Sequence, residues 1–225
     1  MTKLRIVSRT DMSFEVFYIN LDRVPHRREF MSLELQKIKL GKVNRFPAVD
    51  AKVPGSLSEA RFRSGISDRW ALPKSAIACF ESHRAVWQMI VDKGLDAALI
   101  LEDDVVLSHE LTAILSKLNA SPQKIDVVKM DFTDGNVCLG PVSDINGVQV
   151  RTLSKCAPSA GAYFVTKSGV ERLLSESEVY GDTVDDFIFA PRKNWKIYHL
   201  VPARAMQLVF NGVDSGGGQD RIIRR

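Results

Sequence analysis

The feature that most constrains the fold is a run of apolar residues that ends in three adjacent acids, in the segment DAALILEDDVVL (residues 96–107). The acids are Glu102, Asp103 and Asp104, and a second short apolar segment follows them. A short apolar run is typical of a strand buried on both faces, and sheets of such strands carry their ligands at the carboxyl ends. Because neighbouring carboxylates repel one another, the pattern predicts a cation between them, either a metal ion or a basic side chain.

The length and composition predict one globular domain. A chain of 225 residues with 45% hydrophobic and 26% charged residues is long enough to bury a large core. We expect residues 1–213 to form this domain and residues 214–225 to form a flexible basic tail. The first residues lack a signal-peptide core, and no apolar run approaches the roughly 18 residues of a membrane span, so a cytoplasmic location is expected. The widely spaced Cys79, Cys138 and Cys156 predict reduced thiols.

The charge balance is modestly basic, with 31 Lys and Arg residues against 27 Asp and Glu residues and a net charge of +4. Such an excess permits an anionic partner, but a solvated basic face has the same composition. The sequence has no RNP-like aromatic signature, no zinc-finger spacing and no long basic run, so no nucleic acid partner is expected. The short segment RIIRR (residues 221–225) predicts weak peripheral contact with the cytoplasmic face of the inner membrane.

Strand and helix patterns alternate over the first 130 residues, which predicts an α/β fold with a mainly parallel central sheet flanked by helices. Residues 131–166 then carry short β-like pieces between Gly, Pro and Asn, which favours antiparallel additions in the C-terminal half. Residues 52–73 are rich in Gly, Pro and Ser and are expected to form a long loop that could act as a lid. Strands are expected at residues 14–20, 43–51, 97–101, 124–130 and 195–201, and helices at residues 21–40, 74–94, 108–118, 167–176 and 183–189.

Two of the three acids are candidates for metal ligands. Glu102 and Asp104 are two residues apart, and in extended geometry their side chains point the same way, so they would hold Mn²⁺ or Mg²⁺ through oxygen. Such a cation binds a diphosphate and neutralises the charge that develops on it as a leaving group. Transfer from a nucleotide-activated sugar is one reaction with this need. The alternative is that helix caps or lysines satisfy the acids.

The segment LILEDDV is also similar to the first strand and acid pair of response-regulator receiver domains. A receiver domain needs a further aspartate at the end of a later apolar strand, followed by a Ser or Thr and a Lys at the ends of two more strands. The corresponding region here reads INGVQVRTLSK, and a long structured segment precedes the acids. These differences exclude a receiver domain.

Seven segments follow one another along the chain: VFYINLDRVPHRRE, FPAVDA, AIACFESHRAVWQ, ALILEDDVVL, SAGAYFVTKSGVERLL, TVDDFIF and VPARAMQ. In this order they resemble the motifs of glycosyltransferase family 25, the lipopolysaccharide and lipooligosaccharide sugar transferases. The resemblance implies a GT-A type fold and transfer of a hexose, galactose or glucose, with inversion, from a UDP-sugar to a core glycan on a lipid-linked acceptor.

The resemblance also assigns residues to donor binding. Arg23 and Arg27 could instead belong to a solvated helix start, and Asp50 to an ordinary turn. A histidine inside an amphipathic helix is most often a packing residue, and His83 could instead bind a phosphate or position the acids. The assigned residues are Asn20, Arg23, Arg27, Asp50, Ser82, His83 and Asp103.

Inversion needs a base that takes the proton of the acceptor hydroxyl as its oxygen attacks. The segment TVDDFIF offers Asp185 and Asp186, and the resemblance favours Asp185, with Asp186 left to cap the helix or bind the sugar. Residues 131–134 at the end of the preceding strand are a third choice by position alone. For His199 a structural role is expected over metal ligation.

Two other functions fit the same acids. A transferase-shaped protein that has lost its activity would serve as a scaffold or binding partner. A metal-dependent enzyme that cleaves nucleotide sugars would use a similar sheet and the same carboxylates.

Overall fold

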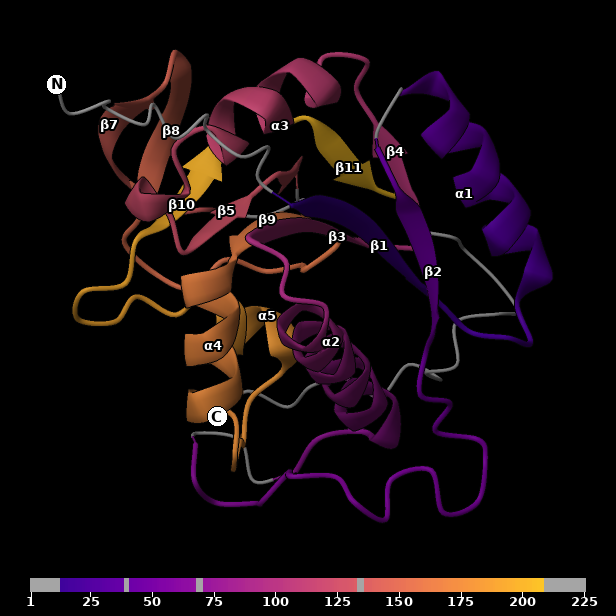
Figure 1. Ribbon diagram of the computed structural model, residues 1–225. Coiled ribbons are helices and arrows are strands. Elements are labelled where there is room, and N and C mark those ends of the chain that lie inside the picture. The colour runs from indigo at the N-terminus through magenta and orange to yellow at the C-terminus, as the bar shows by residue number, and fades with distance from the viewer. Residues whose placement is uncertain (1–12, 39–40, 68–70, 133–135, 209–225) are drawn as a thin grey trace, which may run out of the picture.

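A computed structural model describes residues 13–38, 41–67, 71–132 and 136–208, and its centre is an eight-stranded sheet in the order β2-β1-β3-β9-β5-β10-β8-β7 (Figure 1). Six strands run in one direction, whereas β8 and β9 run in the other. The strands are β1 (Phe14–Asn20), β2 (Val43–Pro47), β3 (Ala97–Glu102), β5 (Val127–Lys129), β7 (Leu139–Ile145), β8 (Val148–Leu153), β9 (Ala162–Thr166) and β10 (Ile197–Leu200). The predicted α/β class, with a mostly parallel sheet and antiparallel additions in the C-terminal half, is confirmed.

Helices cover both faces of this sheet (Figure 1). Pro25 starts α1, where its missing N–H leaves no bond unmade, and Gly94, with φ of 65°, follows the end of α2. Helices α2 (Lys74–Asp92), α4 (Lys167–Glu176) and α5 (Val184–Phe189) lie on one face, and α1 (Pro25–Lys37) and α3 (Leu111–Asn119) lie on the other. None of the described helices is long and apolar enough to cross a membrane.

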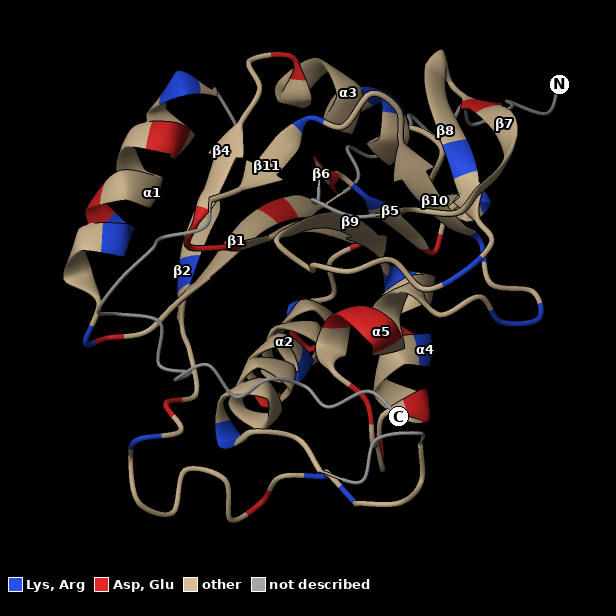
Figure 2. Cartoon of the chain, turned by 180° about the vertical axis from the view of Figure 1, so that it is seen from behind, with Lys and Arg blue, Asp and Glu red and all other residues tan. Residues whose placement is uncertain are grey.

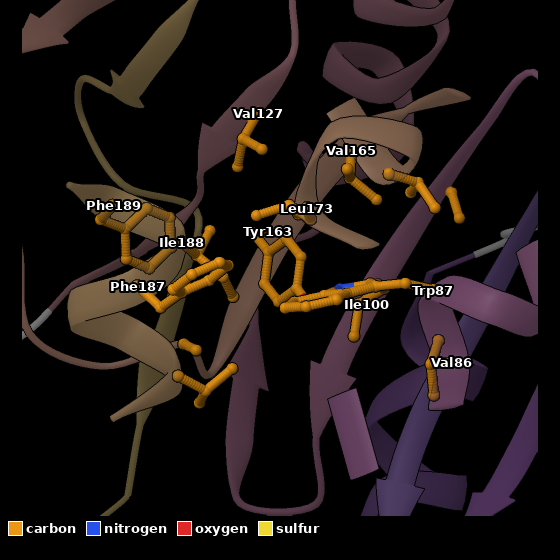
Figure 3. Packing of buried hydrophobic residues seen from close by; sticks show 14 of the residues in the cluster. Val86, Trp87, Ile100, Val127, Tyr163, Val165, Leu173, Phe187, Ile188 and Phe189 are labelled. Atoms are coloured by element: carbon orange, nitrogen blue, oxygen red, sulfur yellow. The ribbon is translucent and has the colours of Figure 1, made fainter. Parts of the chain in front are cut away.

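The core has two layers because successive residues of a strand point to opposite faces. Phe17 and Ile100 join the layer under α2, α4 and α5, whereas Val16 and Leu99 join the layer under α1 and α3. Strand β3 is fully buried over residues 97–101, as predicted for a strand covered on both faces. The first layer is rich in aromatic rings, and Figure 3 shows Trp87, Phe187 and Phe189 around Tyr163 of β9.

A second, three-stranded sheet lies beside the first and was not predicted. It has the order β4-β11-β6, from β4 (Val105–Leu107), β11 (Ala205–Gln207) and β6 (Asp131–Phe132). These strands are two or three residues long, which is too short for a period-two pattern to show in a sequence. The expected extended path through the acids is also wrong, since residues 103–104 form a turn between β3 and β4.

The predicted long loop is present over the described part of residues 52–73, and hydrogen bonds join it to the rest of the protein. Arg61 N–H donates to Glu81 Oε1 on α2 at 2.8 Å, and Arg63 N–H donates to Tyr180 O at 2.9 Å. Ser67 Oγ donates to the backbone before α5. The three cysteines are unpaired, as predicted. The predicted tail at residues 214–225 lies outside the described residues.

Candidate active site

The carboxyl ends of three strands and the start of a fourth meet at one edge of the large sheet. Asn20 ends β1, Glu102 ends β3 and Lys129 ends β5. Because β9 runs the opposite way, the residues just before it, including Ser159, lie at this same edge, and Glu102 N–H donates to Gly161 O at 2.8 Å. Polar side chains from distant parts of the sequence therefore converge where sheets of this kind bind ligands.

Asp103 is held by two of the residues predicted beside it. Asn20 Nδ2 donates to Asp103 Oδ2 at 2.7 Å, and Arg27 Nη1 donates to Asp103 Oδ1 at 3.0 Å. Arg27 Nη1 also lies 3.4 Å from Asp104 Oδ2. One cation among the acids is therefore a basic side chain from α1, which was one of the two predicted choices.

Glu102 and Asp104 share a second hydrogen-bond donor, the side-chain amide of Gln207. Gln207 Nε2 donates to Glu102 Oε2 at 2.8 Å and to Asp104 Oδ1 at 3.2 Å. Burial raises the pKa of Asp104 to about 7, the nearby Glu102 charge adds to the rise, and Arg27 opposes it. The two carboxylates thus lie close enough for their repulsion to favour a proton on one of them.

This pair fits a hard divalent cation. Two carboxylate oxygens converge on one amide nitrogen of Gln207, and oxygen is the ligand that Mn²⁺ and Mg²⁺ prefer. A cation there would remove the repulsion that raises the pKa of Asp104. The assignment of Glu102 and Asp104 as ligands agrees with this geometry, and metal binding itself stays a prediction.

A cavity of about 230 Å³ opens beside the pair, and Glu102, Gln207, Ser159 and Asp185 line it. Ser159 N–H donates to Asp185 Oδ2 at 3.0 Å, and Ser159 Oγ lies 2.8 Å from Gln207 Oε1. Asp185 and its neighbour form the acidic part of α5, red in Figure 2. Asp186 instead accepts from Thr183 Oγ1 at 3.3 Å at the start of the helix. The cavity therefore joins Asp185 to the acidic motif.

The remaining predicted donor residues divide into two groups. Arg23 Nε and Asp50 Oδ2 form a partly exposed ion pair at 2.6 Å beyond the ends of β1 and β2. Ser82 Oγ accepts from Val49 N–H at 2.8 Å and donates to Ala78 O at 2.7 Å, so its hydroxyl is satisfied inside the protein. Donor contact by all of these residues stays a prediction.

His83 is fully buried on α2, and its Nε2 lies 3.3 Å from Glu102 Oε1. Of the roles considered for it, this position favours holding the acids. His199 is buried in β10, where its Nδ1 donates to Leu200 O at 2.8 Å and burial lowers its pKa. That contact agrees with the structural role expected for it.

No role at the site was predicted for Lys129, Ser159 or Gln207, although Ser159 and Gln207 lie within two of the seven segments. Lys129 Nζ pairs with Asp131 Oδ1 at 2.7 Å with both side chains fully buried. Burial lowers the pKa of Lys129 and raises the pKa of Asp131, and their mutual contact opposes both shifts. A lysine inside the apolar run of residues 125–130 is a sequence signal for such a pair, since buried charges need partners. Within residues 131–134, the third choice for the base, Asp134 lies outside the described residues.

Ser159 has a backbone φ of 69°, which residues with a side chain rarely adopt. This conformation accompanies its two roles, since its N–H holds Asp185 while its hydroxyl reaches Asp131 Oδ2 at 2.5 Å. Strained residues of this kind collect at functional sites. Backbone strain at a single serine leaves no pattern in the sequence.

Comparisons with known proteins agree with the sequence resemblance. A Drosophila melanogaster protein named glycosyltransferase 25 family member is 41% identical over 193 residues, which are 83% of this chain and 26% of that protein. Human procollagen galactosyltransferase 2 is 31% identical over 128 residues, 52% of this chain and 19% of that protein. The human inactive glycosyltransferase 25 family member 3 is 33% identical over 115 residues, 46% of this chain and 18% of that protein. The chain thus spans about a quarter or less of the length of these relatives.

Among solved structures, Staphylococcus aureus TarS 1-349 in complex with UDP-GlcNAc has a TM-score of 0.47 at 12% identity, over 90% of this chain and 60% of that one. A glycosyltransferase involved in glycosylation of the major capsid of PBCV-1 has a TM-score of 0.39 at 13% identity, over 72% of this chain and 65% of that one. The sequence profile of glycosyltransferase family 25 (LPS biosynthesis protein) matches residues 14–188, which include every residue of the site except Gln207. Because this match covers most of the chain, the chain belongs to glycosyltransferase family 25.

Proposed function

We propose that this chain is a glycosyltransferase domain that moves a sugar from a nucleotide-activated donor to an acceptor hydroxyl. The observation that carries the proposal is that Glu102 and Asp185 line the same cavity. A glycosyltransferase needs one group that helps to stabilise the charge on the leaving diphosphate and another that acts as the base for the acceptor hydroxyl. Glu102 and Asp185 are the two carboxylates proposed for these roles. Membership of the family supports the same activity.

The proposed donor is a UDP-hexose, with galactose favoured over glucose because two human and mouse relatives are named procollagen galactosyltransferases. Its nucleotide would lie beyond the carboxyl ends of β1 and β2, where the Arg23 and Asp50 pair is partly exposed. Its diphosphate would lie toward Arg27 and the acids, since a guanidinium binds phosphate oxygens in pairs.

Glu102 and Asp104 are the proposed ligands of Mn²⁺ or Mg²⁺. When bound, the cation supplies positive charge to the leaving diphosphate. Other side chains around the cavity position these two ligands. Arg27 orients the acid cluster through Asp103 and Asp104, and Gln207 keeps Glu102 and Asp104 on one side.

Asp185 is the proposed base of an inverting reaction. Ser159 N–H holds one carboxylate oxygen, Oδ2, so the proton of the acceptor hydroxyl would pass to the other oxygen, Oδ1. The acceptor oxygen then forms its bond to the anomeric carbon as the bond from that carbon to the diphosphate oxygen breaks. Asp186, held by Thr183, is left to orient the start of α5.

The proposed acceptor is a lipid-linked core oligosaccharide of lipopolysaccharide, as the family description suggests. Several animal relatives are instead named procollagen galactosyltransferases, and this chain covers 19% of the human one, so a procollagen acceptor is tested beside the core oligosaccharide. The basic segment at residues 221–225, outside the described residues, is the proposed weak membrane contact. Binding to anionic vesicles before and after removal of residues 214–225 tests it, and equal binding would contradict it.

A second function has one observation in its favour, since a human relative is named an inactive family member. Such a protein would bind donor or acceptor without transfer. Both functions are tested with a panel of UDP-sugars, with Mn²⁺ and with EDTA, in which free UDP is measured alone, with a lipopolysaccharide core acceptor and with a procollagen acceptor. Transfer that needs the acceptor supports the proposal. UDP release that no acceptor increases indicates a cleaving enzyme, and thermal protection by a UDP-sugar without release indicates the inactive protein.

A further inference from the structure

The second oxygen of Glu102 faces the protein interior, where two side chains of α2 meet it. Glu102 Oε1 lies 3.3 Å from His83 Nε2 and 3.7 Å from Cys79 Sγ. Cys79 and His83 are four residues apart, so they share a face of the helix. The ligand atoms of the three residues lie within 4.8 Å of one another, a spacing that suits either a metal site or a hydrogen-bonded support for Glu102.

The hydrogen bonds behind His83 decide between these two arrangements. Trp87 Nε1 lies 2.9 Å from Tyr163 Oη, and because an indole N–H only donates, the tyrosine oxygen accepts there. Tyr163 Oη lies 2.8 Å from His83 Nδ1, so the tyrosine proton goes to that nitrogen. An imidazole whose Nδ1 accepts carries its proton on Nε2, which then donates to Glu102.

Burial keeps water out of this series of hydrogen bonds, so each donor must find its acceptor within the protein. The side chains of Trp87, Tyr163 and His83 are all fully buried, so water does not replace a member of the chain. Figure 3 shows the Tyr163 and Trp87 rings side by side in the aromatic layer of the core. Had His83 carried its proton on Nδ1, the tyrosine oxygen would receive two N–H groups, and its own proton would have no acceptor among the described residues.

We propose that Trp87, Tyr163 and His83 are positioning residues that fix the Nε2–H tautomer of His83 and thereby hold Glu102 by Oε1. Glu102 Oε2 then faces Gln207 and Asp104, on the side where the cation is proposed. The tautomer follows from the contacts alone, whereas its benefit to cation binding rests on the proposed function. A metal on Cys79 and His83 would need Nε2 without its proton and would strand the tyrosine hydroxyl, so the three residues support Glu102 and do not form a metal site of their own.

The tautomer is measured directly by ¹⁵N NMR of the full chain, which contains four histidines. His83 is assigned by its loss in His83→Gln. We expect a protonated Nε2 and an unprotonated Nδ1 in the wild-type protein, and a mixture of tautomers in Tyr163→Phe. A wild-type His83 with its proton on Nδ1, or on both nitrogens, would overturn the proposal whether or not the protein binds a cation.

The effect on the cation is measured as the Kd for Mn²⁺ by electron paramagnetic resonance, with folding followed by circular dichroism. His83→Gln keeps an N–H near the position of Nε2, whereas His83→Met has similar bulk and no donor. We expect His83→Met to weaken Mn²⁺ binding by about 10-fold to 100-fold and His83→Gln to weaken it much less. Equal affinities in the two variants and the wild-type protein would contradict the positioning role. Failure of the wild-type protein to bind Mn²⁺ would contradict the proposed metal instead.

Co²⁺ distinguishes the remaining arrangement, because a thiolate bound to Co²⁺ gives an intense charge-transfer absorption. We expect Co²⁺ to give no such band with the wild-type protein. A thiolate band that disappears in Cys79→Ser would show that Cys79 binds metal, and would overturn the proposal.

Discussion

At the scale of single residues, the site depends on where protons and charges are held. Asp104 is the clearest example, because burial beside Glu102 raises its pKa to about 7 while Arg27 opposes the rise. The folded protein therefore binds a proton at Asp104 under conditions in which the unfolded chain has released it. A bound cation would take the place of this proton.

Asp104 predicts how the metal-free protein responds to pH. Because its pKa is raised on folding, its contribution to stability is present below pH 4 and is lost as the pH rises toward 7. Urea unfolding of EDTA-treated protein should show a free energy of unfolding that falls over this range by at most about 1.4 kcal/mol per pH unit from this group. In Asp104→Asn that part of the slope should vanish, and an unchanged slope would show that Asp104 titrates normally.

We expect substitutions of the neighbours Asp185 and Asp186 to have different effects on activity. Asp185 lines the cavity and Asp186 binds Thr183, so Asp185→Asn should lower kcat by about 10² to 10⁴ with little change in donor Kd. Asp186→Asn is the matched control and should retain most of the activity. A crippled Asp186→Asn beside an active Asp185→Asn would move the base by one residue, and two active variants would place it elsewhere.

The residues of the site were predicted to different degrees. The acids at residues 102–104 and the aspartates of α5 come from short motifs, and the structure brings Glu102 and Asp185 to one cavity. Ser159 and Gln207 lie within two of the segments that carry the family resemblance, but their roles were not predicted because these depend on contacts with Asp185 and Asp104, which are far from them in the sequence. A local pattern carries no information about such contacts.

At the scale of helices and strands, long elements with clear periodicity were predicted and short ones were not. Strand β1 and helix α4 have the predicted bounds, since a mostly apolar run marks β1, and a capping Thr166 and a following polar segment mark α4. Strands β4, β6 and β11 are held by pairing with one another, so nothing within each segment specifies a strand.

Gly169, near the start of α4, lies where a larger residue would not fit. A Cβ on Gly169 would lie 2.3 Å from Asp126 O, a backbone atom that cannot move aside. Gly169→Ala should therefore destabilise the protein by about 1 to 3 kcal/mol, although alanine normally favours a helix. Gly41, where a Cβ would meet nothing within 4 Å, is the control. Chemical denaturation of Gly169→Ala and Gly41→Ala measures both, and a stabilised Gly169→Ala would show that the helix shifts freely.

Glu81 on α2 is the residue through which we expect the long loop to be held to this helix. Its Oε1 accepts from Arg61 N–H at 2.8 Å and from Tyr180 Oη at 2.9 Å. Glu81→Ala removes the acceptor of both donors and should speed hydrogen exchange at the Arg61 amide, with a loss of about 1 to 3 kcal/mol. Glu81→Gln keeps an oxygen in place and should behave like the wild-type protein. Equal exchange in both variants would mean that other contacts hold the loop.

At the scale of the whole molecule, two core layers meet on one sheet, so the domain should unfold as a unit and report ligand binding in its Tm. UDP-galactose with Mn²⁺ at 100 times its Kd should add about 2.7 kcal/mol, or roughly 5 to 10 °C. EDTA should remove most of this gain, and Asp104→Asn should not show it. A shift that survives EDTA in full would mean that the donor binds without a cation.

The separation in sequence between Glu102 and Gln207, 105 residues, also has a consequence during synthesis. Strand β11 is the last element described, and it pairs with β4 and β6, so a nascent chain cannot complete the cavity until that strand has left the ribosome. Contacts between such distant residues form late, because the entropy of closing the long loop between them opposes early formation. A partly made chain would therefore fold much of its large sheet before Gln207 could join Glu102 and Asp104, so the cavity between them and Asp185 is completed late in synthesis.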